Sequence, residues 1–234
     1  MYIIFYMKKN NNILIWGGGL RCQTIIQNSK YILDKKLTIK YIIDTSLKKL
    51  DFKTDIVFSN KLNEINKIIK DCSYFIVAVG AEHGKARFFI STELMKFNLK
   101  PLDFISGHSI INPSATIGMG LQAYEGSIIQ CYSKIGDHCI ISANAIIEHH
   151  SYVGNGCHIM PSATITGNVI IKDFVTIGSN ATILPNVRIE SGAFIGAGSV
   201  VTKNVKKNEL IAGNPAKKIK LVTHKFDLSY FKKN

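Results

Sequence analysis

A branched aliphatic residue returns at every sixth position through most of the second half of the chain. The series is interrupted once, by alanine, and the residue two positions before each member is mostly small. A helix repeats about every 3.6 residues and a strand every two, so a period of six belongs to neither alone. The members of the series are Ile111, Ile117, Ala123, Ile129, Ile135, Ile141, Ile147, Val153, Ile159, Ile165, Ile171, Ile177, Ile183, Ile189, Ile195 and Val201.

A period of six is typical of a solenoid whose coil has flat faces, each a short strand, joined by corners. Three six-residue faces make an eighteen-residue coil, so residues i and i+18 stack at the strand spacing of about 4.8 Å. We expect the branched residue and the small residue before it to point inward. Cys139 and Cys157 are eighteen apart at small positions, so we predict that they are stacked core residues and not a metal or redox pair.

The first hundred residues follow a different pattern, in which strands alternate with helices. Short apolar runs end at glycine or aspartate, and the segments between them have helical spacing. This order predicts a small parallel sheet of the doubly wound, Rossmann-like kind, with ligands at the carboxyl ends of its strands. We expect strands at 12–16, 38–43, 55–58 and 74–79, and helices at 20–33, 63–69 and 85–97.

The two patterns divide the chain into two domains, for which its 234 residues are long enough. We place an α/β domain at 1–106, a β-helix at 107–220 and a C-terminal tail at 221–234.

The chain is basic, since 29 lysines and arginines against 16 acidic residues give a net charge of +13. The basic residues are scattered, so we expect no nucleic-acid polymer as a partner, whereas a small phosphate-bearing ligand is compatible. No apolar run is long enough for a membrane span, and Lys8 and Lys9 follow the short apolar start, the reverse of a secretory signal. The five cysteines are an odd number without a Cys-x-x-Cys pair, which indicates reduced thiols and a cytoplasmic protein.

The repeat, together with the closing segment Ala212–Ala216 (Ala-Gly-Asn-Pro-Ala), resembles the left-handed β-helix of the hexapeptide acyltransferases over about 111–220. With the α/β domain in front, the whole chain resembles the nucleotide-sugar N-acetyltransferases of bacterial glycan pathways such as lipopolysaccharide synthesis. Their relatives include the sialic-acid O-acetyltransferases. The resemblance implies acetyl-CoA as co-substrate, a nucleotide-activated amino sugar as acceptor, a homotrimer that supplies the second wall of the site, and no metal.

Acetyl transfer to an amine needs a base near neutral pH, and histidine suits this role. Glu148, His149 and His150 follow the inward Ile147, so we expect them at a coil corner, facing outward. The resemblance implies that His149 is the general base. In many relatives an acidic residue follows the base, and His150 stands there instead. A second imidazole cannot supply a negative charge, so Glu148, or a carboxylate of another subunit, could orient His149.

The resemblance also implies the residues that bind the donor. His158 lies half a coil after His149 and would contact the acetyl group across a trimer interface; the alternative is a surface histidine beside Ile159. Gly167, eighteen after His149, would stack on it, admit the thioester and offer its N–H to the oxyanion. Further along the coil, the groove for pantetheine would be lined by Gly178, Ser179, Ala197 and Lys203. Lys203 could also contact the coenzyme A phosphates, and the alternative is a solvated lysine.

The glycine loop Gly17-Gly18-Gly19 stands between a strand and a helix, where backbone N–H groups and the helix dipole can bind phosphate. A dinucleotide fingerprint would place glycine where Cys22 stands, which counts against NAD. The resemblance places Asp44 against the nucleotide base or ribose, with a plain turn residue as the alternative. Thr45 and Gly80, also near strand ends, complete the expected substrate site.

Three other functions are compatible with parts of the sequence. O-acetylation of a sugar hydroxyl, such as that of a sialic acid, needs the same base. A non-catalytic relative would bind nucleotide sugar without turnover. A zinc enzyme of the γ-carbonic anhydrase type would need three converging histidines, but adjacent His149 and His150 should diverge at a corner. The candidates for such a cluster are His138, His149, His150 and His158.

Overall fold

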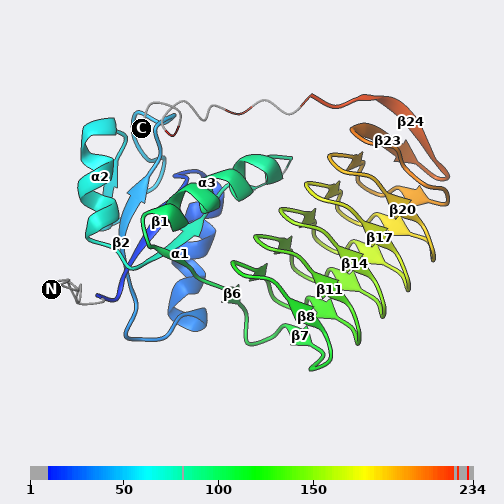
Figure 1. Cartoon of the computed structure of the whole chain (residues 1–234), viewed down its shortest axis with the longest axis horizontal. Coiled ribbons are helices and arrows are strands. Elements are labelled where there is room, and N and C mark those ends of the chain that lie inside the picture. The colour runs from blue at the N-terminus through cyan, green and yellow to red at the C-terminus, as the bar shows by residue number, and fades with distance from the viewer. Residues whose placement is uncertain (1–9, 81, 224–225, 227–230, 232–234) are drawn as a thin grey trace, which may run out of the picture. The chain divides into compact units, whose positions relative to one another are not determined.

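The computed structural model describes residues 10–80, 82–223, 226 and 231. Its contacts form two compact units, drawn in Figure 1. The first unit contains the chain up to Ala78 together with Leu94–Pro101, and the second contains Val79–Glu93 and the chain from Leu102 onward. Among the described residues, no helix has the length and apolar character to cross a membrane.

The first unit is built on a five-stranded parallel sheet in the order β3-β2-β1-β4-β5. This is the predicted doubly wound arrangement, and its order reverses between β1 and β4, where such sheets bind ligands. The strands are β1 (Asn12–Trp16), β2 (Thr38–Ile43), β3 (Val57–Ser59), β4 (Tyr74–Val77) and β5 (Lys100–Pro101), and the helices are α1 (Leu20–Ile32) and α2 (Leu62–Lys70).

The central strands of this sheet are covered on both faces, since Ile13, Leu14 and Ile15 are all fully buried. β1 and β2 have the predicted bounds, whereas β3 starts two residues late and β5 was not predicted. β3 pairs with β2 only from Val57 onward, so the residues before it lie outside the ladder. β5 is a two-residue strand, too short to carry an alternating pattern.

The second unit is a coil of two-residue strands stacked in three rows (Figure 1), which we call faces 1, 2 and 3. Partners in successive coils are eighteen residues apart, as in Ile128↔Ile146 and Ile146↔Thr164. Face 1 contains β6 (Phe104–Ile105), β9 (Gln122–Ala123), β12 (Ile140–Ile141), β15 (His158–Ile159), β18 (Thr176–Ile177) and β21 (Phe194–Ile195). Face 2 contains β7 (Ile110–Ile111), β10 (Ile128–Ile129), β13 (Ile146–Ile147), β16 (Thr164–Ile165), β19 (Thr182–Ile183) and β22 (Val200–Val201). Face 3 contains β8 (Thr116–Ile117), β11 (Lys134–Ile135), β14 (Tyr152–Val153), β17 (Ile170–Ile171) and β20 (Arg188–Ile189).

Face 1 closes with an antiparallel pair, β23 (Glu209–Gly213) and β24 (Ala216–Leu221). The two strands are joined by Asn214 and Pro215, whose peptide bond is cis. This pair contains the Ala-Gly-Asn-Pro-Ala segment singled out in the sequence.

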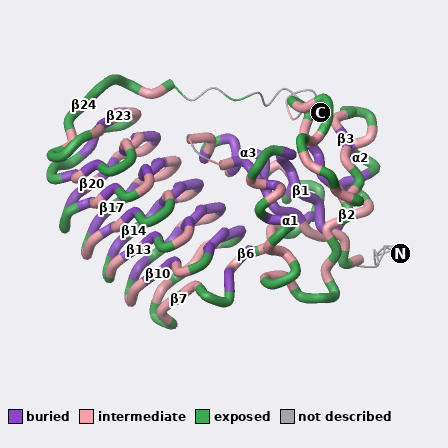
Figure 2. Tube along the Cα trace, turned by 180° about the vertical axis from the view of Figure 1, so that it is seen from behind, coloured by how far each residue is buried: buried purple, intermediate pink, exposed green. Residues whose placement is uncertain are grey.

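The core of the coil is made by the six-residue series and by the small residues before it, as predicted (Figure 2). Cys139 and Cys157 have 0% exposure, and their thiols donate to the carbonyl oxygens of Gly154 at 3.0 Å and Lys172 at 3.1 Å. Burial raises the pKa of the Cys157 thiol well above its usual value. The prediction of stacked, inert core cysteines is confirmed.

From Gly120 to Gly198, the corners of the coil turn through residues with left-handed backbone. Glycine and asparagine adopt this conformation readily and occupy many of these places, for example Gly126 and Asn144. Bulkier residues occupy others, with φ of 59° at Tyr132, 56° at His138, 59° at His150 and 61° at Phe174. A residue with a β-carbon in a sparsely populated conformation costs on the order of 1–3 kcal/mol, so these aromatic side chains should make compensating contacts.

Helix α3 (Gly84–Lys96) begins on the coil, because its first turns group with the second unit and only its end groups with the first. Arg87 is 1% exposed, and its guanidinium donates to the carbonyl oxygens of Val79 at 2.7 Å, His138 at 2.8 Å and Gly156 at 2.7 Å. The Phe88 ring packs edge-on against those of His138 and Phe174, with centroids 5.7 Å apart in each pair. These contacts fix the start of α3 on the coil.

Candidate active site

His149 and His150 lie at the corner between faces 2 and 3, directly after β13. Both side chains are exposed, as the sequence predicted. Their Nδ1 atoms are 3.1 Å apart, and their ring centroids 5.3 Å apart. The expectation that adjacent histidines diverge at a corner is therefore wrong. The backbone turns left-handed at His150, and the two side chains leave the corner together.

Residues of the preceding and following coils contact this histidine pair. The Tyr132 ring, one coil earlier, lies 5.0 Å from that of His150. One coil later, a β-carbon on Gly167 would come within 2.7 Å of Cε1 and 2.9 Å of Nε2 of His149. Gly167 stacks on His149 as predicted, but the space left by its missing side chain is filled by the imidazole and does not serve to admit a thioester.

Glu148 is half-buried and holds the coil through its backbone. Its N–H donates to the Ile165 oxygen at 2.8 Å, and its own oxygen accepts the Ser133 hydroxyl at 2.9 Å. Within the described chain, no hydrogen bond joins its carboxylate to either imidazole. The hydrogen-bond partner of His149 is therefore His150, in place of Glu148.

His158 lies on face 1, in β15, and is separated by that placement from His149 in the same chain. It is only 3% exposed, and its Nε2 lies 3.0 Å from the Ser142 hydroxyl. The alternative of a surface histidine is therefore wrong. His138 stands at the corner between faces 3 and 1, so the four histidines considered for zinc do not converge. Among the described residues, no group of three or more His, Cys, Asp or Glu side chains is placed to hold a metal ion.

The residues predicted to bind the donor occupy two corners of the coil. Gly167 lies at the corner of His149, and Lys203 follows β22 toward that same corner, with its side chain exposed. Ser179 and Ala197 lie at the corner between faces 1 and 2. Gly178 is buried, since a β-carbon there would meet the Ala197 nitrogen and the Ile195 oxygen at 2.6 Å. Glycine at this position thus allows the next coil to pack closely.

The glycine loop after β1 is shaped by packing at its first two positions. A β-carbon on Gly17 would approach the Ala78 oxygen at 3.1 Å, and one on Gly18 would reach Leu50 Cδ2 at 2.8 Å. Gly19 has open space around it, with nothing within 4 Å. It also caps the amino end of α1, so the side of the loop that a ligand can approach is the one at Gly19.

Asp44 supports this loop from the end of β2. One carboxylate oxygen accepts the Gly18 N–H at 2.8 Å, and the other accepts the Ser46 N–H at 2.9 Å and its hydroxyl at 2.6 Å. These bonds make Asp44 a turn residue in the structure, and they use the Gly18 N–H that a phosphate would need. Thr45 is exposed beside it, and Gly80 lies beyond β4 and groups with the second unit.

Cys22 stands where a dinucleotide fingerprint would have its last glycine. The side chain is fully buried in the first turns of α1, and burial, reinforced by the nearby Asp44 carboxylate, raises its pKa to about 12. The thiol is therefore protonated at neutral pH and acts as an apolar packing group.

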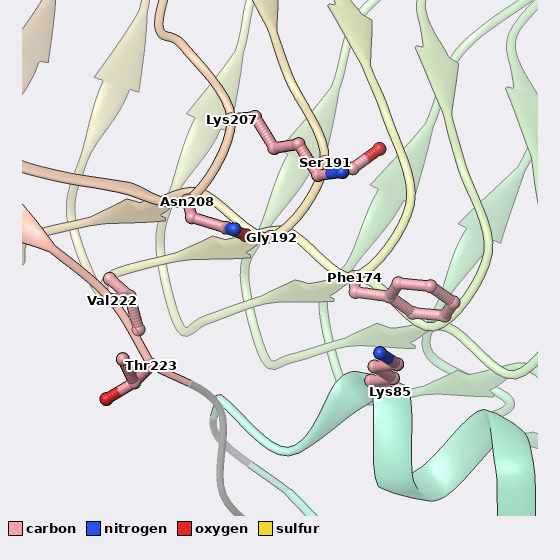
Figure 3. Close-up of a pocket in the computed structure, with 8 residues that line it drawn as sticks. All are labelled: Lys85, Phe174, Ser191, Gly192, Lys207, Asn208, Val222 and Thr223. Atoms are coloured by element: carbon pink, nitrogen blue, oxygen red, sulfur yellow. The ribbon is translucent and has the colours of Figure 1, made fainter.

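A pocket of about 610 Å³ lies away from these residues, on the second unit (Figure 3). None of the predicted site residues lines it. Its lining comes from the start of α3, the corner between faces 3 and 1 and the chain after β24: Lys85, Phe174, Ser191, Gly192, Lys207, Asn208, Val222 and Thr223.

Sequence reasoning did not single out Tyr132 or Arg87. Tyr132 is eighteen residues before His150, and this spacing alone could have placed it against the histidine pair. Nothing in the local sequence marks Arg87, whose partners on the coil, His138 and Gly156, lie more than fifty residues away.

Residues 132–167 and 168–203 match the family model described as bacterial transferase hexapeptide (six repeats). Among solved structures, PerB from Caulobacter crescentus, in complex with CoA and GDP-perosamine, is similar with 23% identity and a TM-score of 0.78, over 89% of this chain and 97% of that one. The acetyltransferase domain of PglB from Neisseria gonorrhoeae has 22% identity and a TM-score of 0.79, over 90% of this chain and all of that one. WeeI from Acinetobacter baumannii has 22% identity and a TM-score of 0.75, over 88% of this chain and 99% of that one.

No curated protein matches the sequence. The structural likeness shows the fold, an α/β domain with a small parallel sheet followed by a left-handed parallel β-helix of hexapeptide repeats.

Proposed function

We propose that this chain is an acetyl-CoA-dependent N-acetyltransferase whose acceptor is the amino group of a nucleotide-linked amino sugar, with His149 as the general base. The observation that carries the proposal is an exposed imidazole, braced by its neighbours, at a corner of this fold. PerB, whose structure contains CoA and GDP-perosamine, supports the choice of both substrates.

The base has a defined task in this reaction. His149 Nε2 takes a proton from the attacking amine while the amine nitrogen forms a bond to the thioester carbon. The carbon–sulfur bond then breaks, and the proton passes to the departing sulfur. Within the described chain nothing accepts the Gly167 N–H, so we propose it as the donor to the oxygen that gains charge.

The donor site requires a second copy of the chain. The predicted donor residues lie at two different corners of one coil, so a single chain does not gather them around His149. In a homotrimer, a corner with Ser179 and Ala197 from a neighbour can face the corner of His149. We leave His158 out of the donor-binding set, because its 3% exposure offers acetyl-CoA almost no ring surface.

The nucleotide is proposed to lie against the first unit, at the carboxyl end of β1. Its phosphates would accept the N–H groups at the amino end of α1, starting at the open Gly19, with the loop held in place by Asp44. Use of acetyl-CoA makes the cytoplasm the proposed compartment and glycan synthesis the proposed context.

The test is to follow free-thiol release from acetyl-CoA with a panel of nucleotide amino sugars. His149→Asn should lose most of the rate, whereas His108→Asn, at another exposed corner, should keep it. Size-exclusion chromatography with light scattering checks the trimer in each variant. A fully active His149→Asn would refute the base. Acetyl groups found on a hydroxyl in the product would indicate O-acetylation, and sugar binding without turnover would indicate a non-catalytic protein.

A further inference from the structure

The contact between the two histidines constrains where their protons lie. A hydrogen bond between two Nδ1 atoms, here 3.1 Å apart, needs one proton and one lone pair. One ring must therefore carry its proton on Nδ1, and the other must have none there. With two protons on these atoms, or with none, the contact is lost.

The same contact indicates which ring is the donor. His149 Nδ1 is engaged with His150, so Nε2 is the nitrogen of His149 that is left to face the amine in the proposed reaction. A base must present a lone pair on the nitrogen that faces the substrate. His149 must then hold its own proton on Nδ1, from which it donates to His150 Nδ1. His150 in turn carries its proton on Nε2.

We propose that His150 is the positioning residue of the base: as a neutral acceptor, it fixes the tautomer and orientation of His149. This inference rests on the proposed function. When His149 gains the substrate proton, its Nδ1–H bond to His150 becomes charge-assisted and strengthens as the reaction proceeds.

The backbone conformation at His150 supports a specific role for its side chain. His150 has left-handed φ of 59°, and the next two coils have asparagine at the same corner position, Asn168 and Asn186, which suits that conformation. Tyr132, one coil before, is held in the same conformation, and its ring packs on that of His150 at 5.0 Å. Tyr132 and His150, at the same position of two successive coils, thus both accept backbone strain. The contact between their rings limits rotation of the His150 ring, which is the acceptor.

The surroundings of the pair contain few groups that titrate. The Tyr132 ring packs on it from the coil before, and Gly167 lies against it from the coil after. Cys131 and Asn168 are joined to it through backbone hydrogen bonds. Glu148 precedes it in the chain, and Lys203 lies further along the same corner.

Two variants separate the acceptor from the backbone strain. His150→Asn keeps an oxygen acceptor, His150→Gly removes it, and both residues suit left-handed backbone. We expect His150→Gly to lower kcat by about 10- to 100-fold with little change in KM. His150→Asn should recover most of that loss. Asn186→Gly, at the same corner, should behave as the starting protein does.

Nitrogen-15 NMR of the labelled imidazoles gives a readout that does not depend on activity. The full-length protein should show His149 as the Nδ1–H tautomer, and His150→Gly should show a mixture. Equal kcat and an unchanged tautomer in His150→Gly would overturn the positioning role, even with His149→Asn inactive. If His149→Asn is fully active, the proposed function fails, and the tautomer measurement still decides whether His150 orients His149.

Discussion

Replacing Gly167 by alanine should disable the base without unfolding the coil. The new β-carbon would lie 2.7 Å from Cε1 of His149, whereas ordinary contact begins at 3.4 Å, so the imidazole must retreat by about 0.7 Å. Such a shift would also disturb the 3.1 Å contact with His150. A misplacement of about 1 Å at a catalytic group can cost about 100-fold in rate, so we expect kcat to fall by about 10- to 100-fold.

Stability should change little, because Gly167 does not have left-handed backbone and lies at a half-exposed corner. Alanine also restricts the unfolded chain, which offsets a small steric cost. The assay is steady-state thiol release, with thermal unfolding measured in parallel. The matched control is Gly107→Ala, also at a corner, where a β-carbon meets nothing within 4 Å. A Gly167→Ala enzyme with the starting kcat would refute the placement of His149 over Gly167.

Three further predictions follow from buried groups. Arg87→Ala leaves carbonyl oxygens of Val79, His138 and Gly156 without their donor and should lower the free energy of unfolding by about 3 kcal/mol or more in urea titrations, whereas exposed Lys85→Ala should change it little. Burial lowers the pKa of His138 from 6.5 to about 4, so the unfolded chain binds its proton first and stability is lost as pH falls from about 6.5 to 4. His138→Asn should remove up to about 3 kcal/mol of this acid dependence, and an unchanged pH profile of unfolding would contradict the assignment. A thiol reagent should modify the half-exposed Cys131 in the folded protein. Burial raises the pKa values of Cys22 and Cys72 to about 12, so these two thiols should react with the reagent only after denaturant is added. Labelling of Cys22 or Cys72 in the folded protein, detected by peptide mass analysis, would contradict their burial.

Part of the candidate site could be predicted because a solenoid converts sequence spacing into position. Eighteen residues make one coil, so Gly167 had to lie beside His149, and both had to lie at an outward corner. The orientation of the rings could not be predicted in this way. The contact between His149 and His150 depends on side-chain torsions and on left-handed backbone at His150, a conformation that few residues other than glycine adopt.

The other differences have the same origin in distant contacts. The burial of His158 depends on what covers face 1, and the periodicity shows only that its side chain points away from the core. Asp44 was expected either against a nucleotide or as a turn residue, and the structure shows its turn contacts, with the Gly18 N–H, twenty-six residues away, and with Ser46.

The sequence by itself determined the period, the set of inward residues, the stacking register and the strands β1 and β2 of the sheet. These features are repeated or local, so each is supported by many residues that agree. Only the tertiary structure decided that Arg87 fixes α3 to the coil, that His158 is buried and that His150 is the partner of His149. These depend on single contacts, some between residues more than fifty positions apart, for which a chain of amino acids carries no local signal.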